Sequence, residues 1–290
     1  MPHSIVRRKF HRINRRSQTQ IANITAIAVL IIISVCAFLY STDKSIKVKE
    51  KDAAAMRVPY SSAVMLKSLS EHYGLPFYEV LAVYAVDNRF LAARLADYDE
   101  TEMTEKYIIS FDALKKQYKE KKLEPYITLF KILFEEIKYF PIPDPNGFYL
   151  YMYGDSYEEA RGGSRSGHLG TDIIHRENVV GQLPVAAMSS GVIERFGFDT
   201  YDGNYIGIRT FYGNYYYYAH LDSFSGIVEL NNHVAAGEIL GYMGDSGKKE
   251  SKSEFPVRLH IGIKVNTKLS KNEFWVNPYI FLRLAEEPVV

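Results

Sequence analysis

The chain has 290 residues, with 35 lysines and arginines against 34 aspartates and glutamates. This length allows one or two domains with additional segments, and the balanced charge excludes a general electrostatic attraction to nucleic acid. Cys36 is the single cysteine, which excludes a disulfide bond within the chain.

The first 40 residues predict a membrane anchor. Residues 1–20 carry six basic side chains and no acidic one, and residues 21–40 are mostly apolar, with Asn23, Thr25 and Ser34 as exceptions. About twenty apolar residues span a bilayer, and a basic flank stays in the cytoplasm. We expect a basic cytoplasmic arm, a single-pass transmembrane helix and an extracytoplasmic remainder, so that the protein is located in the cell membrane.

Two other interpretations of this segment were weighed. A cleaved signal peptide needs a small-x-small site, and none is clear after Phe38. A lipoprotein needs a small residue before its modified cysteine, whereas Val35 precedes Cys36. We therefore favour an anchor that is not cleaved, with Cys36 as an apolar residue inside it.

The next hundred residues predict a linker followed by helices. Residues 41–58 are rich in charged side chains and predict a linker or a juxtamembrane helix. From 59 to 140 apolar residues recur at helical spacing, and Pro76 begins a predicted helix over 77–92. A further amphipathic helix is predicted over 123–140. Residues 59–140 are thus expected to form a small helical domain.

One helix of this domain invites a functional comparison. The segment around Asp87 and Asn88 resembles the helix of lytic transglycosylases that carries a catalytic glutamate. Because neither residue is a glutamate, that activity is not transferred to this chain, and we interpret the domain as a spacer.

A change of pattern marks the C-terminal half. Three prolines at 141–145 predict a link over 141–149, since proline stops a helix and favours extended backbone. Short β-type runs divided by glycines follow, at 185–187, 191–196, 205–211, 214–220, 238–244 and 258–265. The expected fold class is α+β, with the transmembrane helix, the small helical domain and a mainly antiparallel β domain over 150–290.

Two short motifs in the β domain contain metal-binding residue types. His168 and Asp172 are four residues apart in G-H-L-G-T-D, and we predict a strand over 168–175 because the isoleucines after Asp172 favour β structure. Arg258 and His260 are two apart in a run that alternates with apolar residues. Side chains two or four positions apart share one face of a strand.

These motifs predict a zinc site. His168, Asp172 and His260 would supply two imidazoles and one carboxylate, and they would leave a fourth tetrahedral position open. An open position is typical of catalytic rather than structural zinc sites.

The order of further motifs carries a family resemblance. They lie at 184–187, 190–193, 203–208, 217–221, 234–244, 245–247, 258–261 and 276–279. In this order, residues 150–283 resemble the lysostaphin/LytM-type zinc metalloendopeptidases, which cut peptide cross-links in bacterial peptidoglycan. The resemblance implies one zinc ion on His168, Asp172 and His260. It also implies that His220 is a catalytic histidine that orients or deprotonates water and stabilises the oxyanion.

The chain departs from the family at Arg258. The family has H-x-H here, and the first histidine is its second catalytic one. A guanidinium is always protonated and accepts no hydrogen bond, so Arg258 cannot be a general base. It can donate to an oxyanion or bind a substrate carboxylate. The loop before it, 248–257, also differs from the family's short Ser/Thr-Gly-Pro link.

Two functions are therefore open. The first is a zinc endopeptidase that cleaves peptide bonds in peptidoglycan, with His220 assisting proton transfer and Arg258 stabilising negative charge. The second is a degenerate zinc-binding domain that binds cell-wall peptides or a protein partner, as a hydrolase regulator or a sporulation-channel scaffold. No nucleic-acid partner is expected.

The remaining candidates are interpreted as structural. His175 has the opposite strand parity from Asp172 and is expected at the surface or behind the ligands. His233 lies in a turn and is expected in solvent, and His72 is expected on a helix face. The tyrosines at 215–218 are expected to alternate between core and surface.

Overall fold

The computed structural model describes residues 50–90, 99–160, 167–247, 256–266 and 271–286. The predicted arm over 1–20, the predicted span over 21–40 and the first part of the linker over 41–58 lie outside these residues and stay predictions. Within the described ranges, no helix combines the length and the apolar character that crossing a bilayer requires.

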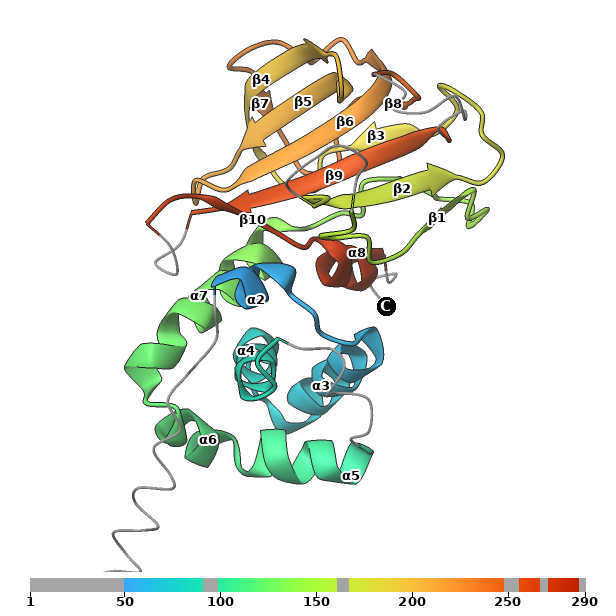
Figure 1. The fold of residues 1–290 in the computed structure, drawn as a ribbon. Helices are drawn as coiled ribbons and strands as arrows, with labels where there is room; N and C mark the ends of the chain where they lie inside the picture. Colours follow the sequence, from blue (N-terminus) through green and yellow to red (C-terminus); the bar gives the residue numbers. More distant parts are fainter. Residues whose placement is uncertain (1–49, 91–98, 161–166, 248–255, 267–270, 287–290) are drawn as a thin grey trace, which may run out of the picture. The chain divides into compact units, whose positions relative to one another are not determined.

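Helices make up the first part of the described chain (Figure 1). Their bounds are α2 Glu50–Ala55, α3 Tyr60–Tyr73, α4 Phe77–Asp87, α5 Glu100–Met103, the π-helix η2 Thr104–Ile109, α6 Phe111–Gln117 and α7 Glu120–Glu136. Every residue of α4 from Val80 to Val86 is buried. Phe77 of α4 packs against Phe134 of α7, with ring centroids 5.2 Å apart, so these two helices share an apolar core.

Two predicted helices end earlier than the sequence pattern indicates. The helix expected over 77–92 ends at Asp87, because Arg89 and Phe90 have left-handed φ values of 56° and 53°. The helix expected over 123–140 is α7, which ends at Glu136. Its chain leaves the helix because the Lys138 amide donates to the carbonyl of Met188, at 2.9 Å.

An antiparallel sheet makes up the second part, which confirms the predicted mainly antiparallel β fold and the α+β class. The strands are β1 Tyr151–Tyr153, β2 Thr171–His175, β3 Pro184–Ala186, β4 Gly191–Asp199, β5 Gly203–Arg209, β6 Tyr215–Phe224, β7 His233–Val234, β8 Ile239–Met243, β9 Arg258–Val265 and β10 Phe274–Val276. Their order is β1-β2-β9-β6-β5-β4-β7, with β10 beside β9 and β8 between β3 and β6 (Figure 1). Helix α8, Tyr279–Glu286, follows the last strand.

The two faces of β9 have different chemistry. Leu259, Ile261 and Ile263 are almost fully buried, and they form the core together with Tyr216 and Tyr218 of β6. Arg258 and His260 lie on the other face, as their alternation predicted. The central strand therefore supplies both the core and the polar residues of one face.

The strand predicted over 168–175 is shorter than expected. It begins at Thr171, so His168 lies in the loop before β2 and not in the strand. The backbone of His168 pairs elsewhere, because its amide donates to Glu159 at 3.0 Å and its carbonyl accepts from Glu158 at 2.8 Å. Asp172 remains in the strand, directly opposite His260 of β9.

A β-bulge interrupts β6 at His220. The register between β6 and its neighbour β5 shifts at this point, and His220 has a left-handed φ of 62°. Ala219 lies opposite His260, so regular alternation would turn His220 towards the core. The bulge turns it back, as bulges beside functional sites commonly do.

Hydrogen bonds connect the helices with the sheet. The buried carboxylate of Glu136, the last residue of α7, accepts from Thr210, from Asn214 at 2.8 Å and from Tyr216 at 3.2 Å. Asn277 donates to the carbonyl of Ala55 at 3.0 Å. The division of the chain into domains at 59–140, 141–149 and 150–290 stays a prediction.

Candidate metal centre

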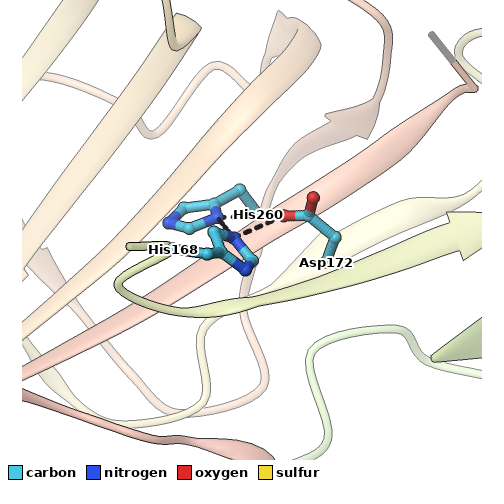
Figure 2. Close-up of side chains that lie close together, drawn as sticks. All are labelled: His168, Asp172 and His260. Carbon is cyan, nitrogen blue, oxygen red and sulfur yellow. Dashed lines mark hydrogen bonds and ion pairs between the residues drawn. The ribbon is translucent and has the colours of Figure 1, made fainter. Parts of the chain in front are cut away.

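Three side chains converge on one face of the sheet (Figure 2). Nε2 of His168 is 2.9 Å from Nδ1 of His260 and 3.1 Å from Oδ1 of Asp172, and the last two atoms are 3.0 Å apart. Asp172 comes from β2, His260 from β9 and His168 from the loop before β2. The structure thus brings together the three predicted zinc ligands.

The geometry of these donors fits a tetrahedral zinc ion. Ligands at about 2.0–2.1 Å from such an ion lie about 3.3 Å from one another. The three donor atoms have nearly equal separations of 2.9–3.1 Å, close to this value. Two imidazole nitrogens and one carboxylate oxygen are also a donor set that zinc prefers. A further position for water or substrate would remain open.

The surroundings of the donors orient them for metal binding. Nδ1 of His168 donates to the carbonyl of Ser156 at 3.0 Å, which leaves the lone pair of Nε2 facing the other donors. Burial alone would raise the pKa of Asp172, but hydrogen bonds with His168 and His260 outweigh it and lower that pKa well below its usual range. Asp172 is therefore a carboxylate at any working pH.

His220 lies beside this group, with its ring centroid 6.4 Å from that of His260. Nδ1 is 2.9 Å from the carbonyl of Ser246, and Nε2 is 2.9 Å from Nη2 of Arg258. Because a guanidinium only donates, Nε2 must accept and Nδ1 must carry the proton. Burial and the charge of Arg258 lower the pKa of His220 to about 3, so this imidazole is neutral.

Arg258 bridges the histidine and the metal ligands. Besides its contact with His220, Nη1 donates to the carbonyl of Pro256 at 3.3 Å. Its Nε lies 3.7 Å from Oδ2 of Asp172. Asp172 therefore presents Oδ1 to the two histidines and Oδ2 to the guanidinium.

A pocket of about 550 Å³ adjoins the centre on the side of β1. Its lining contains Asp172 and Ile174 of β2, and Met152 of β1. On the other side of β9, the ring of Tyr217 lies 6.3 Å from that of His260, and its hydroxyl donates to Asp202 at 2.9 Å. The three donors therefore lie between a pocket and an aromatic wall.

Sequence reasoning missed three positions that shape the centre. Ser156 and Ser246 act through their backbone carbonyls, which no side-chain pattern reveals, although Ser246 lies in the Asp-Ser-Gly motif. Gly170 is required because a Cβ there would meet the His260 ring, with Nε2 at 2.8 Å. The second glycine of G-H-L-G-T-D is the signal in the sequence that could have identified Gly170.

Two further histidines of the described residues lie outside the centre. His175 is buried on the opposite face of β2, where its Nδ1 accepts from the amide of Glu177 at 3.1 Å. A surface position for it was therefore wrong, whereas its separation from the ligands is as expected. His233 is exposed, as the turn before β7 predicted.

Comparisons with known proteins match this part of the chain. The profile described as peptidase family M23 matches residues 166–272. An L-Ala–D-Glu endopeptidase of Bacillus subtilis is 33% identical over 150 residues, which are 51% of this chain and 43% of that protein. The chain thus matches less than half of the length of that curated relative.

Solved structures are similar as well. A protein from Ruminococcus gnavus with the name glycyl-glycine endopeptidase LytM is 33% identical, with a TM-score of 0.65 over 84% of this chain and 94% of that one. The catalytic domain of lysostaphin from Staphylococcus simulans is 31% identical, with a TM-score of 0.37 over 46% of this chain and 92% of that one.

Proposed function

The chain belongs to peptidase family M23, of the LytM and lysostaphin type, and on this premise we propose that it is a zinc endopeptidase that hydrolyses peptide bonds in bacterial peptidoglycan. Members of this family are zinc-dependent metalloendopeptidases. We further propose that residues 21–40 anchor it in the cell membrane as a single-pass helix. The N-terminus is then cytoplasmic and the catalytic centre extracytoplasmic.

The observation that carries the proposal is the donor triangle. Nε2 of His168, Nδ1 of His260 and Oδ1 of Asp172 have separations of 2.9–3.1 Å. Such an arrangement of three partly buried donors with an open side suits a hydrolytic zinc centre. A zinc ion, when bound, polarises a peptide carbonyl and lowers the pKa of a water molecule.

The chain's own residues supply the rest of the chemistry. Hydrolysis adds the hydroxyl of water to the carbonyl carbon and a proton to the nitrogen that leaves. His220 is the residue placed to accept and return that proton, once its Nε2 no longer accepts from Arg258. Arg258 carries a permanent positive charge and stabilises negative charge that develops on the substrate.

The relatives suggest two different bonds. The Bacillus subtilis relative is named for the L-Ala–D-Glu bond. The Ruminococcus gnavus relative is named for a glycyl-glycine bond. Both substrates are peptides without a fixed fold, which suits an open centre between a pocket and an aromatic wall.

A second function is favoured by one specific contact. Nε2 of His220 accepts from Arg258 at 2.9 Å, so the lone pair that a general base needs is engaged. On this alternative, the domain is catalytically degenerate. It retains zinc and binds cell-wall peptides or a protein partner, as a hydrolase regulator or a sporulation-channel scaffold.

Digestion of peptidoglycan distinguishes the two functions. Purified full-length protein in detergent is incubated with peptidoglycans of several cross-link chemistries, with zinc and with a chelator, and new amino termini are measured. We expect release with zinc and none with chelator. The variant His168→Ala should lose both zinc and activity because it removes one of three donors.

The matched control is His233→Ala, which removes an exposed histidine outside the centre. It should retain one zinc ion and wild-type activity, as measured by elemental analysis and by the same digestion. If zinc-loaded wild type releases no new amino termini from any peptidoglycan, the peptidase function is wrong and the binding function takes its place. Equal zinc content in the wild type and in His168→Ala would overturn the metal site itself.

A further inference from the structure

A row of aromatic rings extends from the candidate metal centre along the same face of the sheet. It consists of Tyr205, Tyr215, Tyr217 and Trp275, and we call it the aromatic row. The ring centroid of Tyr217 lies 6.3 Å from that of His260. The other three rings of the row surround Tyr217 at centroid distances of 5.6–6.3 Å. Tyr217 therefore connects the metal centre with the rest of the row.

The strand register explains why the aromatic row and the metal centre share a face. His260, Gly262 and Lys264 alternate along β9 and point to the side of the donor triangle. Tyr217 of β6 lies opposite Gly262, and Trp275 of β10 lies opposite Lys264. Successive strand residues rise about 3.3 Å. Measured along β9 from His260, the row therefore begins at about 7 Å and extends to about 13 Å.

Two glycines leave room for rings of the row to lie over the backbone of the sheet. A Cβ at Gly262 would meet Cζ3 of Trp275 at 2.7 Å, and a Cβ at Gly207 would meet the ring of Tyr215. Tyr215 is buried, whereas the other three residues of the row are half-buried. These three rings therefore still present part of their surface to solvent.

Polar groups that can bind a ligand border the rings. The indole N–H of Trp275 and the hydroxyl of Tyr205 have no hydrogen-bond partner among the residues that the structure describes. Both belong to half-buried residues, so a ligand can reach them. The row thus combines apolar ring surface with available donors, a combination that suits a ligand with both apolar and polar sides.

The charged side chains at the far end of the row are paired with one another. The guanidinium of Arg209 lies 4.9 Å from the ring centroid of Tyr215, and it contacts Glu194 at 2.6 Å and Glu273 at 2.7 Å. Glu273 also pairs with Lys264 at 3.4 Å. Because two basic and two acidic side chains balance here, this group gives no preference for an anion, and the row suits a neutral ligand.

We propose that the aromatic row binds a sugar ring of the glycan strand to which the substrate peptide is attached. This inference rests on the proposed peptidase function and adds a second contact to its substrate. A pyranose ring has apolar C–H faces and polar groups along its edge, which match ring surface with available donors. An extended peptide covers about 7–13 Å in about two to four residues, so one stem peptide can reach from the metal centre to its own sugar.

The consequence is a preference for peptides that still carry their sugar. Such a peptide contacts both the metal centre and the row, and the two linked contacts strengthen binding. A released peptide has only the first contact. The protein therefore acts on intact glycan strands in preference to released peptides.

Trp275 reports on binding to the row because it is the single tryptophan of the chain. Purified full-length protein, in a detergent without a sugar head group, is titrated with the tetramer of N-acetylglucosamine, which is neutral and carries no peptide. We expect a saturable change in tryptophan emission. A stem peptide without sugar is titrated in parallel.

A pair of substrates measures what the sugar contributes to turnover. One is a stem peptide attached to the disaccharide of N-acetylglucosamine and N-acetylmuramic acid. The other is the same peptide with a lactoyl group in place of the disaccharide. We expect kcat/KM to be about 10-fold higher for the sugar-linked peptide, in line with one aromatic contact at a partly exposed site.

Variants connect this preference with the row. Trp275→Leu should bring the ratio of the two kcat/KM values close to one, and Trp275→Phe should retain part of it because an aromatic ring remains. Thermal unfolding checks that both variants are folded. The control is Tyr73→Leu, which removes a ring that is 50% exposed at the end of α3. It should retain the full ratio.

The outcomes are distinct for the sugar site and for the peptidase function. If the tetramer leaves the emission unchanged and the two substrates are cleaved at equal rates, the sugar site is wrong while the peptidase stands. If the free peptide changes the emission and the tetramer does not, the row binds peptide and the proposal is also overturned. Binding of the tetramer without hydrolysis of either substrate would support the sugar site and overturn the peptidase.

Discussion

The absence of a side chain at Gly170 allows the loop before β2 to pack against the His260 ring of the candidate metal centre. Gly170 packs so closely against β9 that a Cβ would meet the carbonyl of Ile261 and the ring of His260. We predict that Gly170→Ala displaces this ring and weakens zinc binding about 10- to 100-fold, the range typical of residues that orient ligands. Competition with a fluorescent zinc chelator measures the change.

A glycine in open space serves as the control for this prediction. Gly226→Ala adds a methyl group with no atom within 4 Å, and zinc affinity should stay at the wild-type value. Unchanged affinity in Gly170→Ala as well would mean that the loop before β2 moves freely and that close packing does not set the position of His260.

At the residue scale, the sequence predicts the ligands better than their surroundings. Asp172 and His260 follow from strand alternation, because a strand fixes which side chains share a face. The orientation of His220 could not be predicted in this way, since it depends on a bulge and on a φ of 62°. Its assignment came from resemblance. The contact between His220 and Arg258 joins residues 38 positions apart, and no local pattern encodes it.

At the scale of elements, one buried carboxylate attaches the end of α7 to the sheet. Glu136→Ala would leave the buried donors of Asn214 and Tyr216 without their acceptor, and Thr210 with only its longer bond to the carbonyl of Asn214, at 3.3 Å. We predict that it lowers the free energy of unfolding by about 2–4 kcal/mol, since buried unpaired polar groups cost about 1–3 kcal/mol each and part of this cost relaxes. Chemical denaturation of purified protein measures the difference.

The neighbouring residue provides the comparison. Glu135 bonds the hydroxyl of Tyr212 at 2.7 Å on the exposed side of the same helix. Glu135→Ala should leave the free energy of unfolding close to that of the wild type, because water replaces the lost contact. A similar decrease in the free energy of unfolding in both variants would show that the buried contacts of Glu136 do not stabilise the packing of α7 against the sheet.

Element types could be predicted, whereas their ends could not. Alternating and helical periods identify β9, α4 and α7, because burial of one face imposes them. The early end of α7 follows from a hydrogen bond between Lys138 and Met188, which are distant in the sequence. The start of β2 at Thr171 follows from the pairing of His168 with Glu158 and Glu159. Where the local sequence pattern and a tertiary contact favour different ends for an element, the tertiary contact decides.

At the scale of the whole molecule, we predict that the protein stays in the membrane with its N-terminus intact. Residues 21–40 are long and apolar enough to span a bilayer. The protein should remain in the membrane pellet after alkaline washing, and mass spectrometry should find its first peptide. Deletion of residues 1–40 should release it, whereas deletion of 41–49 should not. A mature form that begins after residue 38 would contradict the prediction.

The contact between Asn277 and Ala55 has a consequence for the timing of folding. These residues are 222 positions apart, and the Asn277 side-chain amide also donates to the carboxylate of Asp155, at 2.8 Å. Helix α2 is synthesised more than 200 residues before Asn277, and it meets this partner only after Asn277 has left the ribosome. Closing so long a loop is slow compared with local helix formation. The nascent chain therefore stays incompletely folded until Asn277 has been synthesised, and a premature stop before Asn277 would leave α2 without its docking site.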